Sequence, residues 1–306
     1  MQKGYCGQNN KIRLAWAGLH KGEEPPISGG KGSGTVFFSG CNLKCSFCQN
    51  RQISHSNMGR EIEPDLLADI FIALDRAGAE NLNLVTGTPH IPGILSALSI
   101  ARDKGMDFPV IWNTSGYETG ESLELLDDVV DIYLTDIKTL DPALAGRLFE
   151  APNYPSVIKN ALPKMLEGRK TRFRGSSLMK GVIARHLVLP GELKSTYDTL
   201  KWFREEIYGR AILSLMFQFS PNKKHQPWAR RISREEYENV LEWLDELGIE
   251  EGFIQELEKD KKDTSWLPDF TRQNPFPIKQ SHPLWHWRKG FIEPAEQAVS
   301  SINQDR

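Results

Sequence analysis

The chain has 306 residues, of which 39% are hydrophobic and 25% are charged, a composition typical of a globular protein with a sizeable core. Its 38 Lys and Arg residues nearly balance 40 Asp and Glu residues, so the net charge of −2 disfavours binding to nucleic acid or to an anionic membrane. We find no signal peptide, no apolar stretch long enough to span a bilayer and only four cysteines, and we therefore expect a cytoplasmic protein without a disulfide framework.

From residue 34 onward, short β-rich runs alternate with helical patterns. TVFFSG (35–40) predicts the first strand, and EPDLLADIFIALDRAGAE (63–80) predicts an amphipathic helix. Further strands are expected at 81–87, 108–116, 131–138, 181–191, 211–220 and 252–257. Further helices are expected at 92–105, 121–130, 142–151, 156–168, 195–209 and 234–248. Because mostly apolar strands alternate with helices, we predict an α/β fold with parallel pairing, namely a partial (β/α)6-type barrel at residues 34–257.

Two flanks depart from this alternation. Residues 1–33 end in HKGEEPPISGGKGS and are expected to form an irregular N-terminal extension. Within it, EEPPISG either closes over an active site or serves as a rigid connector. Residues 258–306 are rich in Trp and Pro, and we expect this C-terminal extension to pack on the barrel through its aromatic side chains.

Three of the four cysteines lie together. Cys41, Cys45 and Cys48 form a C-x₃-C-x₂-C motif at the carboxyl end of the first predicted strand, where parallel barrels carry their chemistry. Iron–sulfur cubes normally take four thiolates, so three thiolates would leave one iron open to an outside ligand. A structural zinc site would need a fourth ligand, for which His55 is the nearest candidate, and a redox pair would use only Cys45 and Cys48. The motif favours the cluster with an open iron over these two alternatives.

The segment CNLKCSFC, with the aromatic Phe47 before the last cysteine, resembles the signature of the radical S-adenosylmethionine (radical SAM) superfamily. EEPPISGGKGSGTVFFSGCNLKCSFCQN, NLNLVTGTPH, NTSGY, DIYLTDIK and RHLVLPG follow one another in the order found in proteins related to pyruvate formate-lyase activating enzymes. The similarity extends from about residue 20 to residue 275. It implies a [4Fe-4S] cluster held by the three cysteines, with SAM bound to the open iron.

The same resemblance implies an activity. The cluster would cleave SAM reductively, and the resulting 5′-deoxyadenosyl radical would abstract hydrogen from a substrate, for which a glycyl radical enzyme is one candidate. It also implies an electron donor such as flavodoxin or ferredoxin, and a monovalent cation beside SAM.

Several further residues would bind SAM by similarity. Phe47 would lie near the adenine. Thr86, Gly87 and Thr88 end the second strand, where relatives carry a Gly-Gly-Glu motif for the SAM amino group, although here a Thr replaces the Glu. An ordinary strand-ending turn is the alternative for these three residues. Asn113 and Thr114 end the third strand.

Asp136 and Lys138 alternate along the end of the fourth strand, so both can point into the barrel. Such charges are costly there unless they pair with each other or with a ligand. The resemblance implies contacts with the methionine end of SAM, and a structural salt bridge is the alternative. Arg185 shares its strand face with Leu187 and Leu189, and by similarity it would bind the SAM carboxylate. His186 faces the other way, which favours a structural hydrogen bond.

Two classes of function remain. One is a radical SAM enzyme, and the other is a non-catalytic iron–sulfur or zinc protein that acts as an electron carrier or interaction module. A carrier would need four protein thiolates and only a small scaffold, whereas this chain offers three clustered cysteines and a full barrel. The sequence therefore favours the enzyme.

Overall fold

The computed structural model describes residues 4–219, 228–257 and 267–292. The last residue of the expected strand 211–220 and the portions 258–266 and 293–306 of the C-terminal extension lie outside these ranges. No helix among the described residues is long and apolar enough to cross a membrane.

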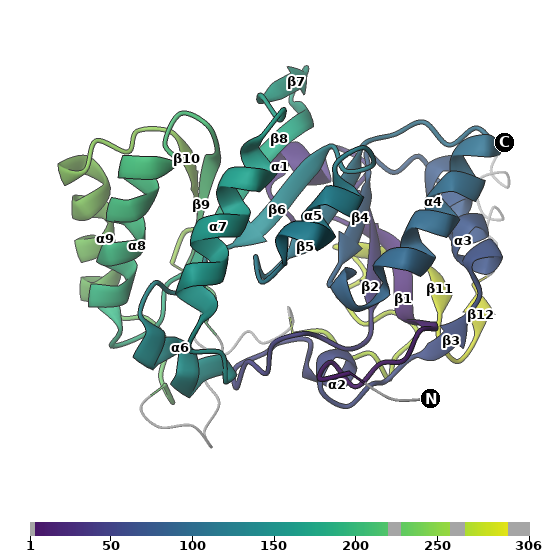
Figure 1. The fold of residues 1–306 in the computed structure, drawn as a ribbon, viewed down its shortest axis with the longest axis horizontal. Coiled ribbons are helices and arrows are strands. Elements are labelled where there is room, and N and C mark those ends of the chain that lie inside the picture. Colours follow the sequence, from purple (N-terminus) through teal and green to yellow (C-terminus); the bar gives the residue numbers. More distant parts are fainter. Residues whose placement is uncertain (1–3, 220–227, 258–266, 293–306) are drawn as a thin grey trace, which may run out of the picture.

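A single curved sheet organises the molecule (Figure 1). Its parallel part runs in the spatial order β2, β4, β5, β6, β8, β9, β10. These strands are β2 (Ser33–Phe38), β4 (Leu82–Val85), β5 (Val110–Thr114), β6 (Ile132–Asp136), β8 (Ser177–Leu187), β9 (Ile212–Met216) and β10 (Gly252–Ile254). The described strands do not pair across the ends of this order, so the sheet stays open. The prediction of an α/β fold with a partial parallel barrel is confirmed.

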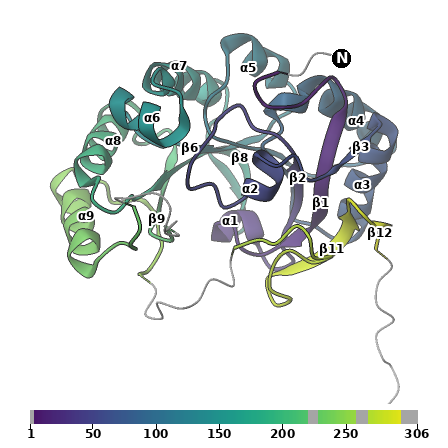
Figure 2. The ribbon, with the colours of Figure 1, turned by 90° about the horizontal axis from the view of Figure 1, so that it is seen from below.

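Helices cover the outer side of the curved sheet (Figure 2). They are α3 (Pro64–Arg76), α4 (Ile91–Asp103), α5 (Gly120–Leu126), α6 (Pro142–Phe149), α7 (Tyr154–Leu166), α8 (Leu193–Glu206) and α9 (Arg234–Glu246). Local signals set their starts: Asp141 caps α6 through its carboxylate, and Ser233 with Glu236 forms a capping box on α9. Apolar faces then bury against the sheet, as the helical periodicity predicts.

Most of the parallel strands are shorter than expected, whereas β8 begins earlier than expected. β8 begins at Ser177 rather than at residue 181, because its first residues form a hairpin with β7 (Arg172–Arg174) before the strand joins the barrel. The basic sequence GRKTRFRG (168–175) contains β7, and the three residues of β7 are exposed.

The N-terminal 33 residues are not irregular throughout, contrary to expectation. Ile12–His20 forms β1, which pairs antiparallel with β2 on one edge and with β3 (Arg60–Ile62) along part of its length. Seven of its nine residues are buried. The Pro and Gly residues of the following segment led to the prediction of irregular structure. β1 forms because strands from distant parts of the sequence pair with it and bury it.

The EEPPISG segment closes the amino end of the barrel. It forms the short helix α1 (Pro25–Ser28). Ile27 packs there against three isoleucines of neighbouring strands, namely Ile111 of β5, Ile132 of β6 and Ile183 of β8. Asn81 Nδ2 donates a hydrogen bond to the Ile27 carbonyl (2.7 Å). This segment, which we call the floor (residues 23–28), therefore closes the barrel across from the cysteine loop and is more than a connector.

The C-terminal segment extends the sheet. β11 (Ser281–His286) pairs antiparallel with β1, and β12 (Gly290–Phe291) pairs with β11. Before β11, Phe270 and Phe276 pack against Trp16 and Phe37, with ring centroids 5.3–5.4 Å apart for the closest pairs. Residues 267–292 are thus part of the same packed body as the barrel.

Candidate active site

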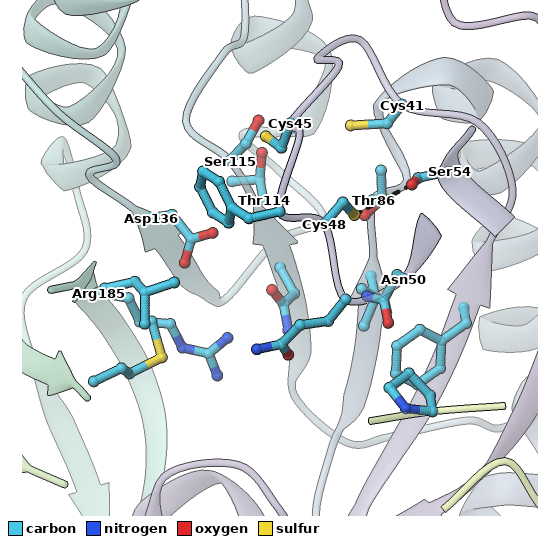
Figure 3. A pocket seen from close by; sticks show the side chains of 18 of the residues that line it. Cys41, Cys45, Cys48, Asn50, Ser54, Thr86, Thr114, Ser115, Asp136 and Arg185 are labelled. Carbon is cyan, nitrogen blue, oxygen red and sulfur yellow. Dashed lines mark hydrogen bonds between the residues drawn. The ribbon is translucent and has the colours of Figure 1, made fainter. Parts of the chain in front are cut away.

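A cavity of about 470 Å³ lies inside the curved sheet, between the cysteine loop and the floor. Its walls include most of the residues singled out in the sequence (Figure 3). These are Cys41, Cys45, Phe47, Cys48, Thr86, Asn113, Thr114, Asp136, Lys138 and Arg185. Gly87 and Thr88 do not line it.

The cysteine loop follows β2 directly and is held by its backbone. Gly40 turns the chain at φ +85°, a left-handed conformation that suits glycine. Farther along, the Ser46 N–H donates to the Leu148 carbonyl (2.8 Å), which ties the loop to the end of α6. The loop therefore presents its side chains at the carboxyl end of the barrel.

The three thiols share one side of the cavity and form no disulfide. The Leu43 N–H donates to Cys41 Sγ (3.4 Å), and Ser54 Oγ lies 3.2 Å from Cys48 Sγ. Burial raises the pKa of Cys41 to about 11 and raises that of Cys45 as well. In the metal-free chain these two groups are therefore protonated thiols, and metal binding must displace the protons.

The donor set fits a cluster better than a single ion. Among the residues that the structure describes, no three His, Cys, Asp or Glu side chains come together at the separations that one metal ion requires. His55, the candidate fourth zinc ligand, instead places its Nδ1 2.8 Å from Ser54 Oγ. A cube distributes its protein ligands over separate corners and uses backbone N–H groups near the sulfurs, as Leu43 provides here. The three cysteines therefore suit a [4Fe-4S] cluster.

Phe47 contributes an aromatic wall next to the thiols. Its ring packs against Phe219, which follows β9, with centroids 5.8 Å apart. A flat apolar surface of this kind excludes water from the neighbouring cluster site and offers a face for a planar base.

The turn after β4 is strained, and a buried acid supports it. Thr86 has φ +59°, an unusual conformation for a β-branched residue, and such strain is found preferentially at functional sites. Thr88 Oγ1 donates to Glu118 Oε1 (2.8 Å), and Thr114 Oγ1 donates to the same oxygen. Burial raises the pKa of Glu118, and its Oε2 has no hydrogen-bond partner. Thr88 thus braces the wall from behind, whereas Thr86 faces the cavity.

Asp136 and Lys138 lie together on the cavity wall, with Lys138 Nζ 2.8 Å from Asp136 Oδ2. Burial alone would lower the pKa of Lys138, but the adjacent carboxylate outweighs it and raises that pKa. Tyr154 holds this strand end: its hydroxyl lies 2.8 Å from the Ser115 carbonyl and 2.7 Å from the Asp136 carbonyl, which share its one proton, and it accepts from the Lys138 N–H. Lys138 is therefore a cation held in place beside the thiols.

Arg185 points into the cavity but is already engaged. Its Nε and Nη2 donate to Glu24 (2.8 and 2.7 Å), and Nη2 also donates to Glu23. Arg185 thus anchors the floor to β8. Of the two cations on the cavity wall, Lys138 lies near enough to Cys41 and Cys45 to oppose the rise of their pKa, whereas Figure 3 shows Arg185 across the cavity from the cysteines.

Sequence reasoning named the EEPPISG segment but missed the roles of Glu23, Glu24 and Glu118. Glu23 and His20 line the cavity, together with Gln218 and Gln255 from the far strands and Phe276 from the C-terminal segment. The two adjacent acids before a Pro-Pro pair were a signal, because acidic residues next to a buried helix need a partner. Nothing local indicates that the partner is Arg185, more than 150 residues away.

Comparison with known proteins decides the family. Residues 35–203 match the family model described as the radical SAM superfamily. This chain belongs to that superfamily. An uncharacterised protein of Methanocaldococcus jannaschii is 35% identical over 246 residues, which cover 76% of this chain and 67% of that protein.

Comparison with solved structures finds chains that match over part of their length. HydG, a maturase of the [FeFe]-hydrogenase, matches with a TM-score of 0.50 at 14% identity, over 72% of this chain and 50% of that chain. SuiB of Streptococcus suis, bound to its precursor peptide SuiA, matches with a TM-score of 0.49 at 14% identity, over 71% of this chain and 46% of that chain. The chain described here spans about half the length of these two proteins, and the likeness concerns the fold alone. Membership of the superfamily implies a [4Fe-4S] cluster and SAM as cofactors.

Proposed function

We propose that this protein is a radical SAM enzyme that abstracts hydrogen from a substrate bound in the central cavity. The observation that carries this proposal is the presence of three free thiols on one side of that cavity, in a chain of this family. When bound, a [4Fe-4S] cluster held by these cysteines would supply the one electron that cleaves SAM to methionine and a 5′-deoxyadenosyl radical.

The chain's own residues would bind and orient the cofactors. Cys41, Cys45 and Cys48 would hold the cluster, and Phe47 would exclude water beside it. Lys138 provides a fixed positive charge on the cavity wall near the thiols, suited to a carboxylate of SAM. Thr86 and Thr114 offer hydroxyl groups at neighbouring strand ends.

Finer features of the proposal rest on similarity of motifs. We include a place in the branch related to pyruvate formate-lyase activating enzymes, with a glycyl radical enzyme as one candidate substrate. We also include a monovalent cation near Asp136, flavodoxin or ferredoxin as the electron donor, and a cytoplasmic location.

Anaerobic reconstitution tests the core of the proposal. With ferrous iron and sulfide, we expect four irons per chain and a brown chromophore, and with dithionite and SAM we expect 5′-deoxyadenosine. Replacing Cys45→Ala removes one cluster ligand and should reduce the yield of 5′-deoxyadenosine by more than roughly 100-fold.

Cys6→Ala is the matched control, because Cys6 lies outside the cavity and should leave iron content and product unchanged. Stoichiometric zinc binding without a chromophore, or full activity in Cys45→Ala, would contradict the proposal.

A further inference from the structure

The floor of the cavity contains two carboxylates that share one cation. Glu24 binds Arg185 with both oxygens, and its Oε1 also accepts from Ser214 Oγ (2.8 Å). Burial alone would raise the pKa of Glu24, but Arg185 outweighs it and lowers that pKa. Glu24 and Arg185 therefore form an internally neutral pair.

Glu23 is the carboxylate without a cation of its own. Its Oε2 shares Arg185 Nη2 with Glu24, and its Oε1 accepts from Asn83 Nδ2 (3.1 Å). Its side chain is 10% exposed and lines the cavity. A carboxylate removed from water is costly unless a positive charge compensates it.

No other charged residue of the described cavity supplies that compensation. Asp136 is already matched by Lys138. His20 lines the cavity beside Glu23, and burial lowers its pKa, although Glu23 opposes this effect, so its ring is neutral near pH 7. With Glu24 included, three carboxylates face two cations, which leaves one excess negative charge.

A buried acceptor next to Glu23 adds to this imbalance. Asn83 is fully buried, and its Oδ1 has no hydrogen-bond partner. Because Nδ2 of the same amide donates to Glu23, the unpaired oxygen lies beside that carboxylate and adds its partial negative charge there. The floor thus has more acceptors than donors, and a ligand with several donors and a positive charge would correct both deficits.

We propose that Glu23 binds the primary ammonium group of the substrate. This inference rests on the proposed function and names a substrate class for the same cavity. A compact ammonium has three donors and a full charge, which matches a carboxylate that must be reached through a cavity. Leu187, Met216 and Phe276 line the cavity as well and provide apolar surface for the carbon chain that carries the ammonium. Since the floor lies across the cavity from the thiols, binding at Glu23 would present that carbon chain toward the cysteine side.

Binding of small probes to the full chain tests this inference without relying on turnover. We would measure n-butylammonium, n-butanol and n-butyrate by saturation-transfer NMR. We expect n-butylammonium to bind at least tenfold more tightly than the other two, which share its alkyl chain but not its positive charge. Glu23→Gln should weaken n-butylammonium binding about tenfold while Glu24 keeps Arg185 and the floor in place.

Glu61→Gln is the matched control, since Glu61 pairs with Arg13 on the surface (2.8 Å) and should leave binding unchanged. A thermal unfolding scan of each variant checks the fold. Equal binding of all three probes, or unchanged binding in a folded Glu23→Gln variant, would overturn the inference.

Two further measurements identify the source of the ammonium group and distinguish failure of this inference from failure of the proposed function. A blocked tripeptide with a central lysine identifies the source of the ammonium: tighter binding than n-butylammonium supports a protein substrate, and weaker binding supports a small amine. Production of 5′-deoxyadenosine by the reconstituted wild type is measured separately. Loss of that product with intact amine binding would contradict the proposed function and not the ammonium site.

Discussion

Arg185 and His186 are neighbours in the sequence, yet they face opposite sides of β8, and one is a cation while the other is neutral. Arg185 enters the cavity as a cation between two glutamates. His186 is buried on the other side, where Nδ1 donates to the Ile137 carbonyl (2.7 Å) and Nε2 accepts from Thr196 Oγ1 (3.1 Å). Burial lowers the pKa of His186 to about 4, although the Ile137 carbonyl opposes this shift. The neutral ring therefore links β8 to the end of β6 and to α8.

The pKa of His186 predicts how stability depends on pH. The pKa is about 4 in the folded chain and about 6.5 in the unfolded chain, so the unfolded chain takes up the proton first as the pH falls. The contribution to stability is complete above pH 6.5 and is lost progressively down to pH 4, by about 3 kcal/mol. Urea unfolding across this range should show a steeper loss in the wild type than in His186→Gln. Parallel curves for the two proteins would refute this assignment.

At the scale of elements, the turn between β5 and α5 connects the cavity wall to its buried support. Thr114 ends β5, and Glu118 lies four residues later and accepts from both Thr88 and Thr114. Gly116 lies between them with φ +74°, and a Cβ there would collide with Ile158 of α7 and approach the Asp136 carbonyl to 3.1 Å. Close packing and backbone conformation both require glycine at this position.

Gly116→Ala should therefore lower the free energy of unfolding by more than the positive φ alone explains. Gly168 is a matched control, because its φ is +65° but a Cβ there would meet nothing within 4 Å. We expect Gly168→Ala to lower the free energy of unfolding by about 1 kcal/mol, and Gly116→Ala to lower it by a further 1–3 kcal/mol. Denaturant titration of both variants measures the difference. Equal losses would show that Ile158 moves aside at little cost.

At the scale of the whole molecule, the C-terminal segment completes the barrel wall. β11 continues the sheet from β1, and the Phe270 carbonyl accepts from both His286 and Trp287. Phe276 reaches the cavity, with its ring 4.5 Å from that of His20. The cavity is thus bounded by segments from both ends of the described chain.

Phe270 tests whether this segment unfolds together with the barrel. It is fully buried, so Phe270→Ala should lower the free energy of the single unfolding transition by about 3–5 kcal/mol. Phe291→Ala is the control, because Phe291 is 48% exposed and should change stability by less than about 1 kcal/mol. Far-UV circular dichroism and tryptophan fluorescence should report one common midpoint. Two separate transitions in the wild type would mean that the segment is independent.

The sequence predicted those parts of the fold and site that depend on local pattern. The alternation of strands and helices gave the barrel, and the alternation of side chains along a strand placed Asp136, Lys138 and Arg185 on the cavity wall. β1 was missed because its burial comes from distant strands. The roles of Glu23 and Glu118 were missed because their partners are set by packing between segments that are far apart or by a tight turn.

β2 has a consequence for the size of any bound molecule. The strand leads from the segment that follows the floor to the cysteine loop, and its six residues span about 20 Å when extended. β1 and β4 pair with it on both sides and keep this length fixed. If the amine of a compound binds at Glu23, the carbon that reaches the cysteine side is set by the length of the compound's chain. Chain length itself would then select the bond that is broken.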